Sequence, residues 1–104
     1  MRMFTLAACA FIAELICPQS ALADVNNGRN LADRWCASCH VTSAEQRLAT
    51  EAPPFASIAN KGNIDAARLA YFLMNPHPVM PNMGLTRNEA ADLAAYIMSL
   101  KTSR

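Results

Sequence analysis

The sequence predicts an all-α domain with three main helices, and three observations support this class. Apolar residues recur at spacings of three and four in three separate segments, the period of a helix with one buried face. Proline-containing stretches separate these segments. No strand-like alternation surrounds the central cysteine pair. The total length of 104 residues allows only one small domain.

Residues 1–23 are typical of a secretory signal peptide. One basic residue precedes a largely apolar run from Met3 to Ile16, and Ala21-Leu22-Ala23 has the small-x-small form of a cleavage site. The apolar run is too short to span a bilayer comfortably. We expect export to the periplasm and cleavage after Ala23, with residues 24–104 as the mature domain. Lipidation at Cys9 and retention of the leader as an anchor stay open as alternatives.

The charge balance bears on the partners. The net charge is +1, and it stays +1 without the leader because Arg2 and Glu14 leave together. A nearly neutral domain lacks the basic surface that nucleic acids require, so we expect no nucleic-acid partner. No second apolar segment is long enough for a membrane span. We therefore expect no stable membrane span after cleavage. We also expect a monomer.

The first predicted helix extends from about Val25 to Cys39. Gly28, Leu31, Ala32 and Trp35 form its apolar stripe. A glycine inside this stripe costs roughly 0.5–1 kcal/mol relative to alanine. We therefore expect a second helix to cross closely at Gly28.

Residues 41–52 have no clear period and are predicted as a loop. Ala52-Pro53-Pro54-Phe55 should interrupt regular structure, and Phe55 and Ile58 should anchor this segment to the core. The second helix is expected to begin near Asn63 or Ile64, with Asp65 in its first turn. It should bury Leu69, Phe72 and Leu73 and end before Pro76.

A stiff loop over residues 75–84 contains three prolines, one glycine and two methionines. After it, Thr86-Arg87-Asn88-Glu89 matches a helix capping box. The last helix should therefore extend from about Arg87 to Leu100. Its inner face is predicted to carry Ala90, Leu93, Ile97 and Leu100, with Tyr96 beside them.

Cys36-Ala37-Ser38-Cys39-His40 is the motif around which the chain is organised. Two thiols two residues apart, followed directly by a histidine, have the spacing of covalent haem attachment. Each thiol can form a thioether with one haem vinyl group, and the histidine can then bind the iron axially. We therefore expect one haem c, bound through Cys36 and Cys39, with His40 as a ligand of the iron.

Three other interpretations of the cysteine pair are weaker. A disulfide across two residues would close a small, strained loop. A thioredoxin-like site requires a βαβ pattern around the motif. A zinc site needs four ligands, and His77 is the only candidate histidine outside the motif.

The mature chain resembles the small bacterial class I cytochromes c over most of its length. The matching pieces are the glycine-containing first helix, the haem motif, the Pro-x-aromatic segment at Pro53 to Phe55, a methionine loop and the last helix. The resemblance implies a cytochrome c-like fold of three main helices around the covalently attached haem. It also implies that Gly28 lies against Leu93 and Tyr96 where the first and last helices cross.

The resemblance further implies a methionine as the second axial ligand. Met80, within Pro78-Val79-Met80-Pro81, has the expected spacing before the capped helix, and Met83 is the alternative. His77 is a third candidate, because histidine is a common iron ligand. In the family, a proline carbonyl accepts the second ring proton of the ligating histidine, which points to Pro53, with Pro54 as the alternative.

These features predict an electron carrier and not an enzyme. With His40 and Met80 on the iron, no open position is left for a substrate, and transient redox proteins are the expected electron donor and acceptor. Two alternatives stay open. The domain can be a haem subunit of a larger dehydrogenase or oxidase. It can also be a haem enzyme or gas-binding protein whose sixth position is open.

Overall fold

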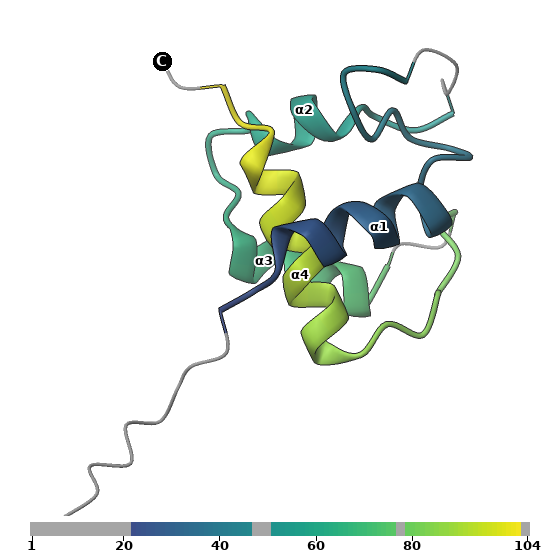
Figure 1. Ribbon diagram of the computed structural model, residues 1–104, viewed down its shortest axis with the longest axis vertical. Coiled ribbons are helices and arrows are strands. Elements are labelled where there is room, and N and C mark those ends of the chain that lie inside the picture. The colour runs from purple at the N-terminus through teal and green to yellow at the C-terminus, as the bar shows by residue number, and fades with distance from the viewer. Residues whose placement is uncertain (1–21, 47–50, 77–78, 103–104) are drawn as a thin grey trace, which may run out of the picture.

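The computed structural model describes residues 22–46, 51–76 and 79–102, and within these ranges the chain is helical without strands (Figure 1). Its helices are α1 (Val25–Trp35), α2 (Phe55–Ala59), α3 (Ala66–Met74) and α4 (Arg87–Ser99). The predicted all-α class is confirmed. Nearly all of the predicted leader lies outside the described residues, as do Cys9 and His77. In the described part of the chain, no helix is long and apolar enough to cross a membrane.

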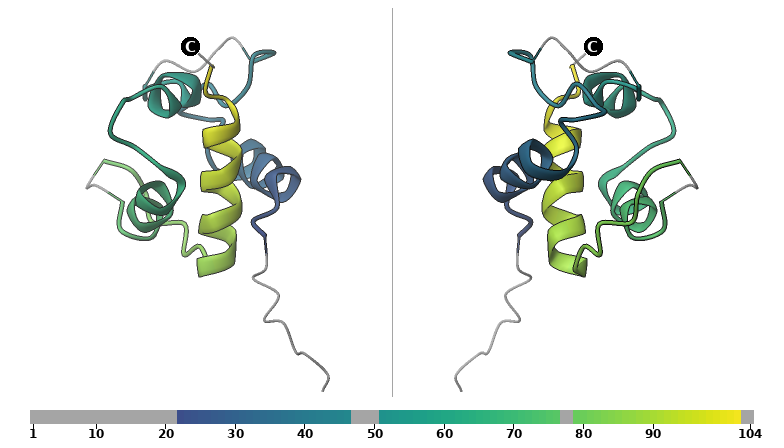
Figure 2. Two further views of the ribbon diagram at one scale, coloured as in Figure 1. Left: turned by 90° about the vertical axis from the view of Figure 1, so that its left-hand side faces the viewer. Right: turned by 90° about the vertical axis from the view of Figure 1, so that its right-hand side faces the viewer.

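Helix α4 is the central element. Figure 2 shows it between α1 on one side and α2 and α3 on the other. The close crossing predicted at Gly28 is confirmed: a Cβ atom built there would lie 2.0 Å from the Asp92 carbonyl oxygen and 2.8 Å from Tyr96 Cβ. The expected contact with Leu93 is not among these nearest atoms, since Leu93 points into the core. Only glycine leaves room for the two backbones at this point.

Asp92 also fastens the first turn of α1 to α4. Its carboxylate accepts hydrogen bonds from the Asp24 backbone nitrogen at 2.7 Å and from Asn27 Nδ2 at 2.8 Å. Asp24 in turn caps α1 by accepting a bond from the Asn27 backbone nitrogen at 3.1 Å. The crossing is therefore fixed by hydrogen bonds at its edge as well as by close packing at Gly28.

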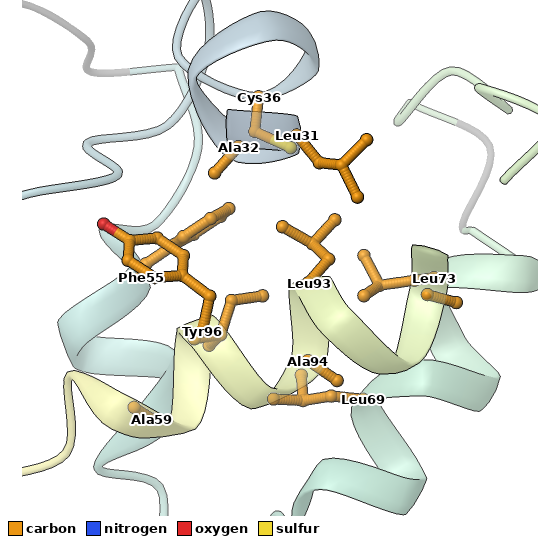
Figure 3. Close-up of a cluster of buried hydrophobic side chains, with 12 residues drawn as sticks. Leu31, Ala32, Cys36, Phe55, Ala59, Leu69, Leu73, Leu93, Ala94 and Tyr96 are labelled. Carbon is orange, nitrogen blue, oxygen red and sulfur yellow. The ribbon is translucent and has the colours of Figure 1, made fainter. Parts of the chain in front are cut away.

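The core lies where the helices meet on α4. Leu31 and Ala32 of α1 lie over Leu93, with Phe55 and Tyr96 beside them (Figure 3). The remaining buried apolar residues are Cys36, Ala59, Leu69, Leu73, Ala90, Ala94 and Ile97.

The predicted apolar stripe of the first helix is wrong at Trp35, because 48% of the surface of this residue is exposed. It follows Gly28 by seven residues, or about 10 Å along the axis, so it lies beyond the crossing with α4. Helix α1 also ends at Trp35 instead of near Cys39, with Cys36 as its C-terminal cap. The haem motif is therefore a turn that follows the helix.

The short helix α2 differs from the sequence prediction, which places an interruption of regular structure at Pro53 and Pro54. Pro54 instead occupies the N-cap position with φ −58°, a value that proline provides before a helix. Phe55 is buried and Ile58 partly buried, as predicted.

The boundaries of α3 and α4 largely follow their predicted signals. Asp65 is the N-cap of α3 and accepts a bond from the Arg68 backbone nitrogen at 2.8 Å, so α3 begins slightly later than predicted. Leu69 and Leu73 are buried, whereas Phe72 is 39% exposed. The capping box of α4 is confirmed: Thr86 and Glu89 exchange backbone-to-side-chain bonds of 3.0 and 3.1 Å.

Tyr96 joins α4 to the segment after the haem motif, and replacing it with phenylalanine is expected to destabilise the fold. Its hydroxyl donates a 2.6 Å hydrogen bond to the buried Thr42 carbonyl. Loss of this bond should lower the free energy of unfolding by about 1–2 kcal/mol, as measured by urea denaturation at neutral pH.

The difference in free energy of unfolding between the unaltered protein and the Tyr96→Phe protein should shrink at alkaline pH. Burial, together with the nearby Asp33 and Glu45, raises the pKa of Tyr96 above 10.0, although Arg29 opposes the shift. The folded state thus favours the neutral hydroxyl. Its contribution to the free energy of unfolding is fully present below the pKa of Tyr96 in the unfolded chain, and it is lost as the pH rises through the pKa of Tyr96 in the folded state. A deficit that grows between pH 7 and pH values above about 10 would contradict this direction.

Candidate haem site

One large cavity lies against α2, α3 and α4 and the segment before α2. Its volume is about 760 Å³, within the range of roughly 300–1,000 Å³ that is usual for cofactor sites. Its lining is mainly apolar and includes both His40 and Met80. The other lining residues are Pro53, Phe55, Ile58, Lys61, Asn63, Ile64, Ala67, Arg68, Leu69, Tyr71, Phe72, Leu73 and Ile97.

His40 is held from two sides. Its Nδ1 atom lies 2.6 Å from the Pro53 carbonyl oxygen, and its ring packs on Phe55 at a centroid distance of 5.1 Å. Because a carbonyl oxygen can only accept, Nδ1 donates its proton to it, and in the neutral ring Nε2 then has the lone pair that a metal requires. The acceptor is Pro53, the first of the two predicted candidates.

The two cysteines of the motif differ in environment. Cys36 is buried at the end of α1, and burial, followed by the neighbouring Cys39, raises the pKa of its thiol to about 11. Cys39 is exposed, and neither thiol is in a disulfide. A reactive redox cysteine needs a lowered pKa, so the Cys36 environment is the opposite of a thioredoxin-type site.

The zinc interpretation also lacks structural support. Within the described ranges, no three histidine, cysteine, aspartate or glutamate side chains are grouped so that they can hold a metal ion. His77, the candidate histidine outside the motif, lies beyond these ranges.

The two methionines of the predicted ligand loop occupy different places. Met80 lines the cavity and packs against the core, whereas Met83 is partly buried but does not line the cavity. After Met83 the chain turns at Gly84, whose φ is +63°, and the Gly84 nitrogen donates to Asn82 Oδ1 at 2.9 Å. The structure therefore brings His40, Pro53 and Met80 to one cavity.

Sequence reasoning missed the polar residues on the cavity wall. Lys61, Asn63 and Arg68 line it, and Arg68 Nη1 donates to the Asn63 carbonyl oxygen at 3.0 Å. Lys61 and Asn63 lie in the connection between α2 and α3, and Arg68 lies in the first turn of α3, so the three have no common period or motif spacing. Only the topology that folds the α2–α3 connection over the cavity brings them to the site.

The cavity fits a porphyrin. Its apolar walls suit the ring and its volume suits a large planar ligand. Lys61 and Arg68 would supply cations for the two haem carboxylates. His40 and Met80 supply an imidazole nitrogen and a thioether sulfur, which are the axial donors found in cytochromes c.

An all-α fold with Cys-x-x-Cys-His at the end of the first helix, and with a histidine and a methionine lining one cavity, defines a c-type cytochrome. Comparison with protein families agrees, because residues 23–97 match the family described as cytochrome c oxidase, cbb3-type, subunit III. The chain therefore belongs to this cytochrome c family and carries covalently bound haem c.

The chain is also similar to an individual cytochrome. It is 47% identical to cytochrome c-552 of Bradyrhizobium diazoefficiens over 95 residues, which cover 89% of this chain and 91% of that protein. No solved structure matches the chain. These relatives identify a small c-type cytochrome that takes part in electron transfer.

Proposed function

We propose that this protein is a periplasmic monohaem cytochrome that carries single electrons through an iron ligated by His40 and Met80. The observation that carries the proposal is that Met80 lines the same cavity as His40, the last residue of the haem-attachment motif. Bound haem supplies an iron that exchanges one electron between its ferrous and ferric states. Single-electron exchange through a closed site suits a carrier between redox proteins.

The residues that line the cavity orient the iron ligand His40 and set the reduction potential of the haem. The Pro53 carbonyl fixes the ring orientation of His40 and makes Nε2 a stronger donor. The Met80 thioether is a soft donor, which raises the reduction potential by favouring the ferrous state. The apolar walls act in the same direction, since they disfavour the extra charge of the ferric form.

A closed sixth position separates the carrier from a haem enzyme or gas-binding protein. If Met80 binds the iron, the reduced protein at neutral pH should not bind carbon monoxide rapidly. The measurement is the absorbance change after mixing with carbon monoxide, with the Met80→Ala protein as the positive control. Rapid, stoichiometric binding by the unaltered protein would reject the carrier and favour an open-site haem protein.

The family description favours a second candidate, a haem subunit of a larger oxidase. Both candidates use the same site, but they differ in what the protein is bound to. Gel filtration and native electrophoresis of a gently prepared extract separate them. A free carrier migrates at the size of a single small protein, because its redox partners bind only transiently. A subunit migrates at the size of a larger complex, together with additional haem absorption.

The proposed periplasmic location depends on the leader, residues 1–23. Cleavage after Ala23 would leave Asp24 as the first residue, and Asp24 is also the N-cap of α1. N-terminal sequencing of the exported protein tests this boundary. A first residue other than Asp24, or a lipid at Cys9, would contradict the proposed cleavage after Ala23.

A further inference from the structure

Gln46 has a side-chain environment that the sequence did not predict. It follows the haem motif by six residues, in a polar segment without helical or strand period. Its side chain is half-buried and makes four hydrogen bonds, all of them to residues 37–42. These four bonds surround the turn that carries Cys39 and His40.

The donor half of the amide holds the motif itself. Gln46 Nε2 donates to the carbonyl oxygens of Ala37 and His40, each at 2.8 Å. The first carbonyl lies between the two cysteines, and the second belongs to the histidine. One NH₂ group thus fixes the spacing between the middle and the end of the motif.

The acceptor half connects the motif to helix α4. Gln46 Oε1 accepts from the Thr42 backbone nitrogen at 3.0 Å and from Thr42 Oγ1 at 2.8 Å. Thr42 is 1% exposed, and its carbonyl oxygen accepts a hydrogen bond from the hydroxyl of Tyr96. The amide orientation follows from its partners, because two carbonyls require the NH₂ group and a backbone N–H requires the oxygen.

We propose that Gln46 is a positioning residue that sets the backbone, and through it the ring, of His40 relative to the haem iron. The Pro53 carbonyl and Phe55 fix the His40 ring from the cavity side, and Gln46 fixes its backbone from the opposite end. Losing the two donor bonds frees the His40 carbonyl and changes the iron–histidine geometry. This inference rests on the proposed ligation by His40.

Replacement by methionine tests the inference, because Gln46→Met keeps the side-chain length and removes all four bonds. In the ferric holoprotein, the NMR resonances of the His40 ring protons are shifted strongly by the iron and report its geometry. We expect Gln46→Met to displace these resonances and to shift the reduction potential. Gln46→Glu keeps the acceptor for Thr42 and loses the NH₂ donors, so it should produce the same displacement.

Two control variants separate positioning from general stability. Asn60→Leu removes another side-chain amide that donates to the Ala56 carbonyl at 2.7 Å and accepts from Thr102, away from the haem motif. Thr42→Val removes the hydroxyl donor to Gln46 and leaves the bonds to Ala37 and His40. Both should lower the thermal midpoint without displacing the His40 resonances.

The outcomes distinguish this inference from the proposed function. If the unaltered holoprotein shows His40 resonances and Gln46→Met leaves them and the potential unchanged, the positioning role is wrong and the ligation stands. Equal displacement by Asn60→Leu would also overturn it. If the unaltered protein shows no iron-shifted histidine resonances, the proposed ligation itself fails.

Discussion

Replacing Met80 with alanine in the holoprotein is expected to abolish the weak far-red sulfur-to-iron absorption band of the ferric state and to lower the reduction potential by roughly 0.1–0.3 V, since axial ligands set haem potentials over about 0.8 V. The physical reason is the loss of the soft thioether donor that stabilises ferrous iron. The same variant should bind carbon monoxide when reduced, because its sixth position is open. Optical spectra and redox potentiometry measure all three effects.

Met83→Ala is the matched control. Met83 belongs to the same loop and is also partly buried, but it does not line the cavity with His40. It should keep the far-red band and nearly the same potential. Loss of the band in the Met83 variant alone would assign the sixth position to Met83. Persistence of the band in both single variants would reject each methionine as the necessary ligand.

Replacing Gly28 with alanine is expected to destabilise the fold by on the order of 3 kcal/mol. The new Cβ would lie 2.0 Å from the Asp92 carbonyl oxygen and 2.6 Å from its carbon, so no flexible side chain can yield. Helices α1 and α4 must move apart, and the hydrogen bonds of Asp92 to the first turn of α1 weaken with them. A loss of this size corresponds to a fall in the melting temperature of about 15 °C for a domain of this length.

Gly62→Ala provides the control for this measurement. Gly62 lies in the turn between α2 and α3, and a Cβ there meets no atom within 4 Å. Its replacement should be neutral or slightly stabilising, because alanine reduces the freedom of the unfolded chain. If the two variants melt at the same temperature, close packing at Gly28 does not hold the crossing.

Local sequence signals predicted the helices well where the chain itself encodes their ends. The Thr86–Glu89 capping box defines the start of α4, and Pro76 follows the end of α3, because both act within one turn of the backbone. Trp35 and α2 show the limits of such signals. The burial of Trp35 depends on how far α1 extends past α4, and α2 depends on a proline that serves as an N-cap.

The residues of the site likewise divide into those that local sequence signals predict and those that depend on tertiary contacts. The haem motif is contiguous, so Cys36, Cys39 and His40 are visible in the sequence. Met80 and Pro53 came from the resemblance, and both lie at the cavity. Lys61 and Gln46 could not be predicted, because their roles depend on contacts made by irregular loops, and Arg68 could not, because the face of α3 that it occupies is not marked by any motif. Single polar residues in such loops have no period that separates them from solvated ones.

The most direct test of the central proposal is the optical spectrum of the exported, purified protein in both redox states, after maturation in a host that attaches haem c. We predict haem absorption that resists extraction by acidic solvent, a one-electron transition between ferrous and ferric forms, and the far-red band in the ferric spectrum. A colourless protein, or a haem that the solvent removes, would contradict covalent attachment. A ferric spectrum without the far-red band would contradict ligation by Met80.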